Sequence, residues 1–375
     1  MSAPAAPRGI RGSFSASDLV FDNDLSIADV GLLLETAAAI RKEPARYRQA
    51  LAGRTAALLF EKPSLRTRVT FEVAMKSMGG DSIFLDCRGE PIGQREPVAD
   101  VARSLDRWVD AIVARTFLQS TVEELAAWAK VPVINALSDR VHPCQALADM
   151  LTLHDAFGRL QGIHLAYVGD GNNVCHSLLL TGAKVGLRVR VATPASYQPD
   201  SEIVRLASEI AAQTGGSVRV GDDPVEAVAG AHAVYTDVWA SMGSEHEAEV
   251  RRERMRPYQV TEKLFEKARS DAVFLHCLPA HRGEEVEAAV LESSRSVVFD
   301  QAENRLHTQK ALLLMLLECV VPSWIASTSP KASPAKTRAH SGPPAKVPRW
   351  SYHHLYTLKL NLPPAYNIIK MLRNC

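Results

Sequence analysis

The sequence predicts an α/β fold made of two doubly wound parallel-sheet domains. Short apolar runs alternate with helical patterns along almost the whole body of the 375-residue chain, which is typical of parallel strands joined by crossover helices. Several helix starts carry capping residues, as in Ser26-x-x-Asp29 and Thr121-x-x-Glu124, and Asp223-Pro224 adds a proline at the first helical position. We expect one sheet before His142 and a second sheet after the helix that follows it.

The predicted strands are apolar runs that end at polar turns. In chain order they cover Thr55–Phe60, Ala111–Thr116, Val131–Ala136, Ile163–Val168, Arg188–Ala192, Ser217–Val220, His232–Thr236, Ala272–Leu275 and Val297–Phe299. A helix is predicted from Arg66 to the glycine pair Gly79-Gly80, because apolar residues recur there and glycine ends helices. The apolar run Leu312–Val321 is too short to span a membrane and predicts a buried terminal helix.

The segment Phe60–Arg68 joins the first strand to its helix and predicts an anion site. Ser64 lies near the N-cap, where free backbone N–H groups and the positive end of the helix dipole favour a phosphate. The dipole contributes roughly 0.3–1 kcal/mol. Arg66 and Arg68 can each add a charge-assisted hydrogen bond of about 1.5–3 kcal/mol. The alternative for this segment alone is an ordinary capped helix with two exposed arginines.

Other strands deliver polar residues to the carboxyl edges of the predicted sheets. Arg115 ends one strand, and His142 and Gln145 follow the next. Ligands bind at this edge in open α/β sheets, so these side chains can polarise a carbonyl and balance an anion. Taken singly, His142 also fits a hydrogen-bonded histidine at a helix start. In the second half, Asp237–Gly243 follows an apolar strand in the same way, and we interpret it as the amino-acid half of a two-substrate site.

Over roughly residues 17–320 the chain resembles the aspartate/ornithine carbamoyltransferase family. The resemblance is specific because separated motifs occur in the family's order. They are Ser64–Arg68, Arg115, His142–Gln145, Gly169–Asn173, Asp237–Gly243, His276–Pro279 and Glu303–Arg305. The resemblance implies transfer of the carbamoyl group from carbamoyl phosphate to the δ-amine of L-ornithine, giving L-citrulline and phosphate, in arginine metabolism. The alternative is a carbamoyltransferase for another amine, such as putrescine, an N-acylated ornithine or aspartate.

The resemblance also implies a role for each matched residue. Carbamoyl phosphate is expected to be bound by Ser64, Leu65, Arg66, Thr67, Arg115, His142, Gln145, Cys277, Leu278 and Arg305. Ornithine is expected to be bound by Asn173, Asp237, Ser241 and Met242. The residues expected to act in catalysis are Arg115, His142, Cys277 and Arg305. No cofactor is expected.

The implied organisation has two substrate-binding domains and a tail. Residues 17–143 are expected to form the carbamoyl-phosphate-binding domain, with the last helix, residues 304–321, packing back on it. Residues 144–303 are expected to form the ornithine-binding domain. The family further implies a homotrimer or higher homo-oligomer, with sites near the subunit interfaces.

Two positions depart from the family's pattern. Leu65 stands at a variable position where many members carry Thr or Gly, so we expect little effect. Pro91 stands where some members carry a glutamine that reaches the phosphate of a neighbouring subunit, and a proline cannot donate a hydrogen bond. Either Gln94 or Arg95 supplies that contact instead, or the contact is missing.

Carbamoyl transfer to ornithine needs a neutral amine and a stabilised oxyanion. The δ-amine resembles a lysine amine with a reference pKa near 10.4, so about one molecule in several hundred to a few thousand is neutral at pH 7–8. Attack places negative charge on the carbonyl oxygen, so the expected arginines and His142 act mainly as electrostatic stabilisers. Cys277 beside Asp237 is expected to orient or help deprotonate the amine, and the alternative is a buried loop thiol.

Composition fits an intracellular enzyme. Hydrophobic content of 46% and charged content of 23% are globular values. The six cysteines are scattered without C-x-x-C spacing, which argues against a disulfide framework and a structural zinc site. His276, Cys277 and His281 lack further partners at ligand spacing, so no metal site is expected. No signal-peptide core is present and Met1–Arg11 is too short for a transit peptide, so a cytoplasmic location is expected.

Residues 322–375 differ in composition from the body. Pro322–Arg349 is rich in Ser, Pro, Ala and Lys, and no acidic residue follows Glu318. This composition predicts a disordered basic tail that is a solvated appendage. A basic tail with aromatic residues also fits contact with nucleic acid or a membrane surface, but neither partner is expected.

Two more distant functions remain open. Tyr167–Gly171 opens a helix as a dinucleotide-binding loop does, but the third glycine of the G-x-G-x-x-G pattern is absent. The other alternative is a non-catalytic scaffold that kept the fold. A pure binder has no need of a polarising cluster of arginines and a histidine, which argues against that alternative.

Overall fold

The structure is a computed structural model that describes residues 14–239 and 248–317. The expected tail, residues 322–375, lies outside these ranges, as do Ser241 and Met242. Among the helices within these ranges, none combines the length and the apolar character that crossing a bilayer requires.

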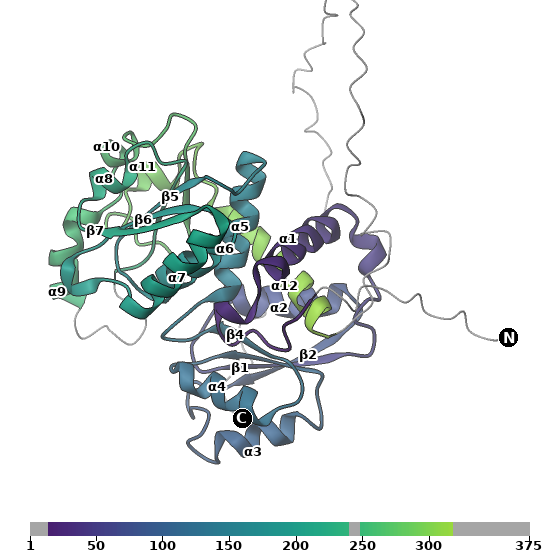
Figure 1. Cartoon of the computed structure of the whole chain (residues 1–375). Coiled ribbons are helices and arrows are strands. Elements are labelled where there is room, and N and C mark those ends of the chain that lie inside the picture. The colour runs from purple at the N-terminus through teal and green to yellow at the C-terminus, as the bar shows by residue number, and fades with distance from the viewer. Residues whose placement is uncertain (1–13, 240–247, 318–375) are drawn as a thin grey trace, which may run out of the picture. The chain divides into compact units, whose positions relative to one another are not determined.

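The first sheet has four parallel strands in the order β2-β1-β3-β4 (Figure 1). The strands are β1 (Thr55–Phe60), β2 (Asp81–Asp86), β3 (Ala111–Arg115) and β4 (Val133–Leu137). The helices of this half are α1 (Ile27–Lys42), α2 (Leu65–Ser77), α3 (Val98–Leu105) and α4 (Gln119–Trp128). Short 3₁₀ turns cover Asp22–Asp24 and Pro44–Tyr47.

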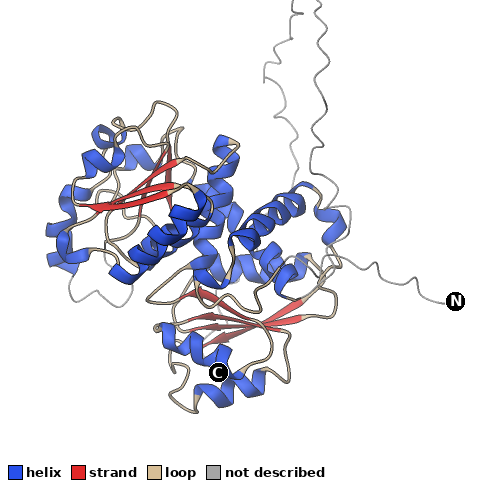
Figure 2. Cartoon of the chain, in the orientation of Figure 1, coloured by secondary structure: helices blue, strands red, loops and turns tan. Residues whose placement is uncertain are grey.

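Strand β1 shows why helices cover both faces of this sheet. Ala56, Leu58 and Phe60 join one hydrophobic core, and the alternate residues Ala57 and Leu59 join another. All five side chains are at most 1% exposed. A parallel strand flanked by helices is buried on both faces, so it is a continuous apolar run rather than an alternating one. Figure 2 shows helices on both faces of each sheet.

The second sheet has five parallel strands in the order β7-β6-β5-β8-β9. The strands are β5 (His164–Val168), β6 (Arg188–Ala192), β7 (Ser217–Gly221), β8 (Ala233–Thr236) and β9 (Val273–His276). The helices are α5 (Pro143–Phe157), α6 (Asn173–Lys184), α7 (Ser201–Thr214), α8 (Pro224–Val228), α9 (Ala248–Met255), α10 (Glu262–Phe265) and α11 (Ala288–Leu291). Further 3₁₀ turns cover Ala195–Tyr197 and Arg256–Tyr258. The predicted pair of parallel sheets, with the change at the helix after His142, is confirmed.

The last described helix, α12 (Val298–Leu316), returns to the first half and packs against α1, α2 and α5 (Figure 1). This return confirms the expectation drawn from the family resemblance. The predicted strand Val297–Phe299 is wrong, because these residues lie at the start of α12, which begins at Val298. The predicted start of this last helix at Asn304 is wrong for the same reason. Three apolar residues are too few to distinguish the period of a strand from that of a helix. Here Val298 is buried and Phe299 is 70% exposed, as successive residues of an amphipathic helix can be.

Two local predictions at helix starts are confirmed and one is wrong. Ser26 forms a complete capping box with Asp29, and Asp223 accepts hydrogen bonds from the first backbone N–H groups of α8. The predicted box at Thr121-x-x-Glu124 is wrong, because α4 already begins at Gln119. The backbone N–H of Gln119 donates to Asp139 Oδ1 at 2.7 Å, so a residue from a distant loop satisfies this helix start.

Candidate functional site

The turn between β1 and α2 leaves the start of α2 open to an anion. Ser64 is the N-cap of α2, and its Oγ accepts a hydrogen bond from the backbone N–H of Thr67 at 3.2 Å. The first turn of α2 contains no acidic residue, so no carboxylate there neutralises the positive end of the helix dipole. The side chain of Leu65 is 76% exposed, so this residue offers the turn a backbone N–H rather than a side-chain contact.

Three arginines from different elements converge on this turn. Arg66 lies in the first turn of α2, Arg115 ends β3 opposite Phe60 of β1, and Arg305 of α12 donates to Thr67 Oγ1 at 2.9 Å. Burial, and then repulsion from Arg305, lowers the pKa of Arg115 to about 9, and burial also lowers the pKa of Arg305. Among the described residues, Nε of Arg115 and Nε of Arg305 have no hydrogen-bond partner. Buried cations with unpaired donors favour an anion, so this cluster suits a phosphate.

A neutral histidine lies next to the arginine cluster. His142 is the N-cap of α5, is 5% exposed, and is held by its backbone N–H, which donates to Ser177 Oγ at 2.8 Å. Burial, and then the three arginines, holds the pKa of His142 well below its ordinary value. The imidazole is therefore neutral near pH 7 and can donate to a carbonyl oxygen without adding another positive charge. Gln145, in the first turn of α5, accepts a hydrogen bond from Arg305 Nη1 at 2.6 Å.

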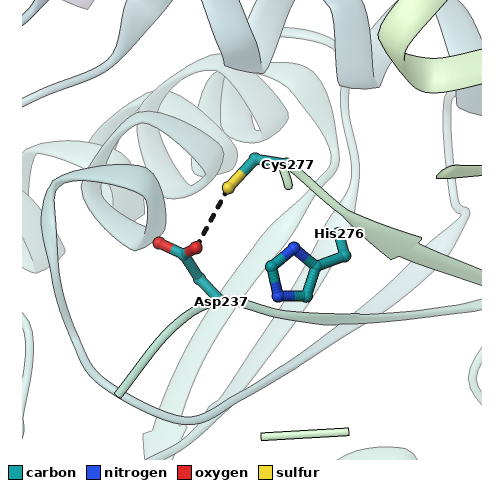
Figure 3. Close-up of side chains that lie close together, drawn as sticks. All are labelled: Asp237, His276 and Cys277. Carbon is teal, nitrogen blue, oxygen red and sulfur yellow. Dashed lines mark hydrogen bonds between the residues drawn. The ribbon is translucent and has the colours of Figure 1, made fainter. Parts of the chain in front are cut away.

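Asp237, directly after β8, faces Cys277, directly after β9 (Figure 3). Asp237 Oδ1 accepts from Cys277 Sγ at 3.0 Å, and Oδ2 accepts from Asn172 Nδ2 at 2.8 Å. The two strands are neighbours, with Thr236 opposite His276, and this register brings the two following residues together. Burial, and then the Asp237 carboxylate, raises the pKa of Cys277 well above its ordinary value, so the thiol stays protonated and donates.

The arginine cluster and the Asp237–Cys277 pair act on each other electrostatically. Burial lowers the pKa of Arg66, and the negative charge of the Asp237 carboxylate opposes that shift. The two groups thus form neighbouring halves of one site, with positive charge on one side and a carboxylate on the other.

His276 is held in one orientation beside the Asp237–Cys277 pair (Figure 3). Its Nδ1 accepts from the backbone N–H of Leu278 at 2.8 Å, and its Nε2 donates to Glu285 Oε1 at 3.1 Å. Asp237, His276 and Cys277 do offer metal-ligand atoms close to one another. Both imidazole nitrogens are nevertheless already hydrogen-bonded, so His276 has none left for an ion. Leu278 adopts a φ of 58°, a left-handed conformation that is uncommon for a branched residue.

The start of α6 does not suit a dinucleotide phosphate. Asn172 caps this helix with its own side chain, which accepts from the backbone N–H groups of Val174 at 3.0 Å and Cys175 at 3.1 Å. At Gly171 an added Cβ would lie 2.3 Å from the backbone nitrogen of Pro199, so packing against protein requires this glycine. Asn173, the first residue of α6, donates from Nδ2 to the carbonyl of Ser138 at 2.6 Å.

Sequence reasoning did not single out two residues that shape the site, Glu61 and Asn172. Glu61 is 4% exposed and accepts from the backbone N–H groups of Ile92 at 2.8 Å and Phe117 at 2.6 Å. It therefore fixes both the segment that contains Pro91 and the chain just after Arg115. An acidic residue directly after a buried strand was the available signal for Glu61. For Asn172 the signal was an asparagine at a helix start.

Gln94 and Arg95, named as substitutes for the contact missing at Pro91, both lie at the surface. The Gln94 side chain is exposed, and Arg95 pairs with its neighbour Glu96 at 3.1 Å. Both side chains are thus accessible in a single subunit.

Through the contacts above, the structure brings together Ser64, Arg66, Thr67, Arg115, His142, Gln145, Asp237, Cys277 and Arg305.

Comparison with known proteins finds similarity over the whole described body. The family described as Aspartate/ornithine carbamoyltransferase, carbamoyl-P binding domain, matches residues 17–155, and Aspartate/ornithine carbamoyltransferase, Asp/Orn binding domain, matches residues 161–316. An ornithine carbamoyltransferase of Parafrankia sp. (strain EAN1pec) is 53% identical over 307 residues, which cover 81% of this chain and 97% of the relative. An anabolic ornithine carbamoyltransferase of Pyrococcus furiosus is 49% identical over 307 residues, covering 81% and 98%. A solved ornithine carbamoyltransferase from Pyrococcus furiosus has a TM-score of 0.78 at 50% identity, covering 80% of this chain and 97% of that one.

Proposed function

Because the chain belongs to the aspartate/ornithine carbamoyltransferase family, we propose that it transfers the carbamoyl group of carbamoyl phosphate to the δ-amine of L-ornithine. The products are L-citrulline and phosphate. One observation carries the proposal: an arginine cluster at the start of α2 adjoins a buried carboxylate that accepts a thiol hydrogen bond. The arginines suit a phosphate, and the carboxylate suits a cationic or neutral amine. The anabolic name of the Pyrococcus furiosus relative supports a role in arginine biosynthesis.

The phosphate of carbamoyl phosphate is proposed to sit at the start of α2. Its proposed ligands are Ser64, Arg66 and Thr67, the backbone N–H of Leu65, and Arg115. Unpaired Nε–H of Arg115 and the free N–H groups of the helix start are donors of the kind that phosphate oxygens need.

The carbamoyl group is proposed to lie between His142, Gln145 and Arg305, with the backbone of Leu278 completing its surroundings. As the amine attacks, negative charge grows on the carbonyl oxygen. A neutral His142 and a charged Arg305 stabilise that charge by donating to it, and Arg115 stabilises the leaving phosphate. No covalent intermediate with the protein is required, because carbamoyl phosphate is already an activated donor.

Asp237 and Cys277 are proposed to orient the δ-amine. A thiol with a strongly raised pKa remains protonated, so Cys277 fixes the carboxylate of Asp237 rather than taking a proton from the amine. The carboxylate then accepts a hydrogen bond from the amine and holds its lone pair toward the carbamoyl carbon. This positioning supplies part of the rate enhancement by proximity.

The rest of ornithine is proposed to be held by Asn173, Ser241 and Met242. Among the alternative acceptors, aspartate is disfavoured because the carbon that bears its only amine also bears the α-carboxylate, which would lie beside the carboxylate of Asp237. Putrescine lacks the α-carboxylate that the amide of Asn173 could bind. Free ornithine has both the amine and the α-carboxylate, so it uses both ends of this half of the site.

The protein is proposed to act as a cytoplasmic homotrimer. Apolar side chains lie exposed on α2 and on the edge strand β2, including Val69 at 46%, Val73 at 41% and Ile83 at 51%. Clustered exposed apolar residues are typical of protein–protein contacts. Light scattering on the purified protein tests the trimer.

We also propose the domain boundaries stated above, 17–143 and 144–303, which agree with one sheet before α5 and one after it.

A citrulline assay with carbamoyl phosphate tests the function, comparing ornithine with putrescine, aspartate and N-acetylornithine. Product from ornithine with little from the others supports both the reaction and the acceptor. Turnover of a different amine retains the Ser64–Arg68 half of the proposal and replaces the Asp237 half. A folded protein that binds carbamoyl phosphate but carbamoylates none of the four amines contradicts the proposal and points to Pro91.

A further inference from the structure

A buried row of hydrogen bonds runs from Arg305 to the backbone of His276. Arg305 Nη1 donates to Gln145 Oε1 at 2.6 Å, and Gln145 Nε2 donates to Asp149 Oδ1 at 2.8 Å. Gln301 Nε2 donates to the same Asp149 oxygen at 2.7 Å, and Gln301 Oε1 accepts from the backbone N–H of His276 at 3.0 Å. Each of these five residues, which we call the buried row, is at most 2% exposed.

The chemistry of the buried row leaves each glutamine one orientation. An ionised carboxylate only accepts hydrogen bonds, whereas Arg305 and the backbone N–H of His276 only donate. Each glutamine must therefore turn its amide nitrogen toward Asp149 and its carbonyl oxygen outward. An apolar residue at position 149 would remove the acceptor that the two glutamine nitrogens share, so Gln145 Nε2 would lose that partner and Gln301 Nε2 would keep only the Tyr235 hydroxyl. The carboxylate at the centre thus couples the positions of the two glutamines.

The two ends of the buried row reach the two halves of the proposed site. Gln145 and Arg305 are the proposed carbamoyl ligands, and His276 directly precedes Cys277 and Leu278. The residues come from α5, from α12 and from the end of β9, which are far apart in the sequence. A shift of Gln301 would therefore move the start of the His276–Leu278 segment relative to the carbamoyl ligands.

A carboxylate at this buried position lowers the stability of the folded protein when it is ionised. Burial raises the pKa of Asp149 to about 7, and the hydrogen bonds from Gln145 and Gln301 oppose that rise. The charged and titratable groups that face it are Arg305 on α12, Tyr235 on β8 and Cys277 after β9. A well-packed apolar side chain would avoid the cost of burying a charge. The carboxylate therefore fits a functional role better than a purely structural one.

We propose that Asp149 is a positioning residue for carbamoyl transfer, acting through Gln145 and Gln301 without touching either substrate. The carboxylate directs Gln145 toward the carbamoyl group and, through Gln301, fixes the start of the segment that presents Cys277 and Leu278. This inference rests on the proposed function, because it takes Gln145 and Leu278 as ligands of the carbamoyl group.

Substitutions at Gln301 test the inference without altering a proposed substrate ligand. Gln301→Leu breaks the link between Asp149 and His276 and should lower kcat about ten- to a hundred-fold. Gln301→Glu keeps both hydrogen bonds when its carboxyl is protonated, so at pH 6.5 it should recover most of the wild-type kcat. Gln309→Leu is the matched control. It makes the same change on the same helix, at a side chain that is 1% exposed and has no hydrogen-bond partner among the described residues.

Circular dichroism and the oligomer mass first establish that each variant is folded. Wild-type kcat in Gln301→Leu overturns the proposal. So does a Gln301→Glu variant that is as slow as Gln301→Leu at pH 6.5, because a restored link should restore activity. An equal loss of kcat in Gln309→Leu also overturns it, since the effect would then reflect general packing of α12.

A second measurement separates this inference from the choice of acceptor. Carbamoyl phosphate should raise the Tm of the wild type, and the rise should shrink in Asp149→Leu because Gln145 no longer faces the carbamoyl group. An undiminished rise in Asp149→Leu overturns the inference. If carbamoyl phosphate raises the Tm of the wild type but no citrulline forms from ornithine, ornithine is not the acceptor. The comparison of the Tm rise between wild type and Asp149→Leu still tests the role of Asp149 in that case. Absence of a rise in the wild type overturns both proposals.

Discussion

Replacing Asp149 by asparagine should change how the stability of the protein depends on pH. The side chain is 0% exposed, and burial raises its pKa from 3.8 to about 7. The fold therefore favours the protonated form. The stabilisation from this shift is fully present below pH 3.8 and is lost as the pH rises through about 7. Asparagine has nearly the same shape but does not ionise, so the stability of Asp149→Asn does not fall with rising pH for this reason.

The magnitude follows from the size of the pKa shift. Each unit corresponds to about 1.4 kcal/mol, so the ionised carboxylate destabilises the wild type by about 4 kcal/mol at high pH. Between pH 5 and pH 8 the wild type should lose about 2.5 kcal/mol that Asp149→Asn does not lose. With ordinary m values, this corresponds to a difference in urea midpoint on the order of 1 M between the two pH values.

The measurement is urea unfolding of both proteins at pH 5 and pH 8, at one protein concentration because subunit assembly affects midpoints. The variant should gain stability relative to the wild type as the pH rises. Gln309→Leu serves as an uncharged control on α12 and should show the same difference from wild type at both pH values. A difference between Asp149→Asn and wild type that does not change with pH would refute the assigned pKa and its cause.

Three further outcomes test the proposed site. Arg66→Ala should remove a charge-assisted contact of about 1.5–3 kcal/mol, seen as a ten- to hundred-fold loss in kcat/KM for carbamoyl phosphate. Asp237→Asn should raise the KM for ornithine while leaving the binding of carbamoyl phosphate nearly unchanged, because it alters only the amine side. Deletion of residues 324–375 should leave kcat at the wild-type value in the same citrulline assay, because the matched family ends before that segment.

Each of these outcomes has a clear contrary result. Unchanged kinetics in Arg66→Ala would mean that the Ser64–Arg68 turn is only a capped helix. Equal weakening of both substrates in Asp237→Asn would mean that the site is not divided as proposed. A large loss of activity in the truncated protein would assign a function to the tail.

Apart from β6 and the edge strand β7, which are only partly buried, the observed strands that sequence reasoning identified are buried on both faces. Such strands are continuous apolar runs, as Thr55–Phe60 is, and they stand out without any knowledge of their neighbours. Strand β2, Asp81–Asp86, was missed because it lies at the edge of its sheet, ends in aspartates and exposes Ile83. Its assignment depends on pairing with β1, which the local sequence does not encode.

The candidate site was predictable only in part. The helix start at Ser64 and the strand end at Arg115 follow from local patterns, and the family resemblance connected them with Asp237 and Cys277. Asp149 was not predictable in this way, because an acidic residue in a helix normally faces solvent. One of its buried hydrogen-bond partners is Gln301, which lies 152 residues further along the chain. Contacts of that range become visible only once α12 is seen to return to α5.

The return of α12 also has a consequence for the order in which the protein matures. A ribosome produces the first sheet, then the whole second sheet, and only then the helix that carries Arg305. Until that helix is made, α1, α2 and α5 lack the surface against which they pack, and the half-site at Ser64 lacks one of its three cations. Early fragments of the chain therefore cannot bind carbamoyl phosphate in the completed geometry. The phosphate site is therefore complete only when nearly all of the described chain has been synthesised, and a chain that ends before Arg305 lacks one of its arginines.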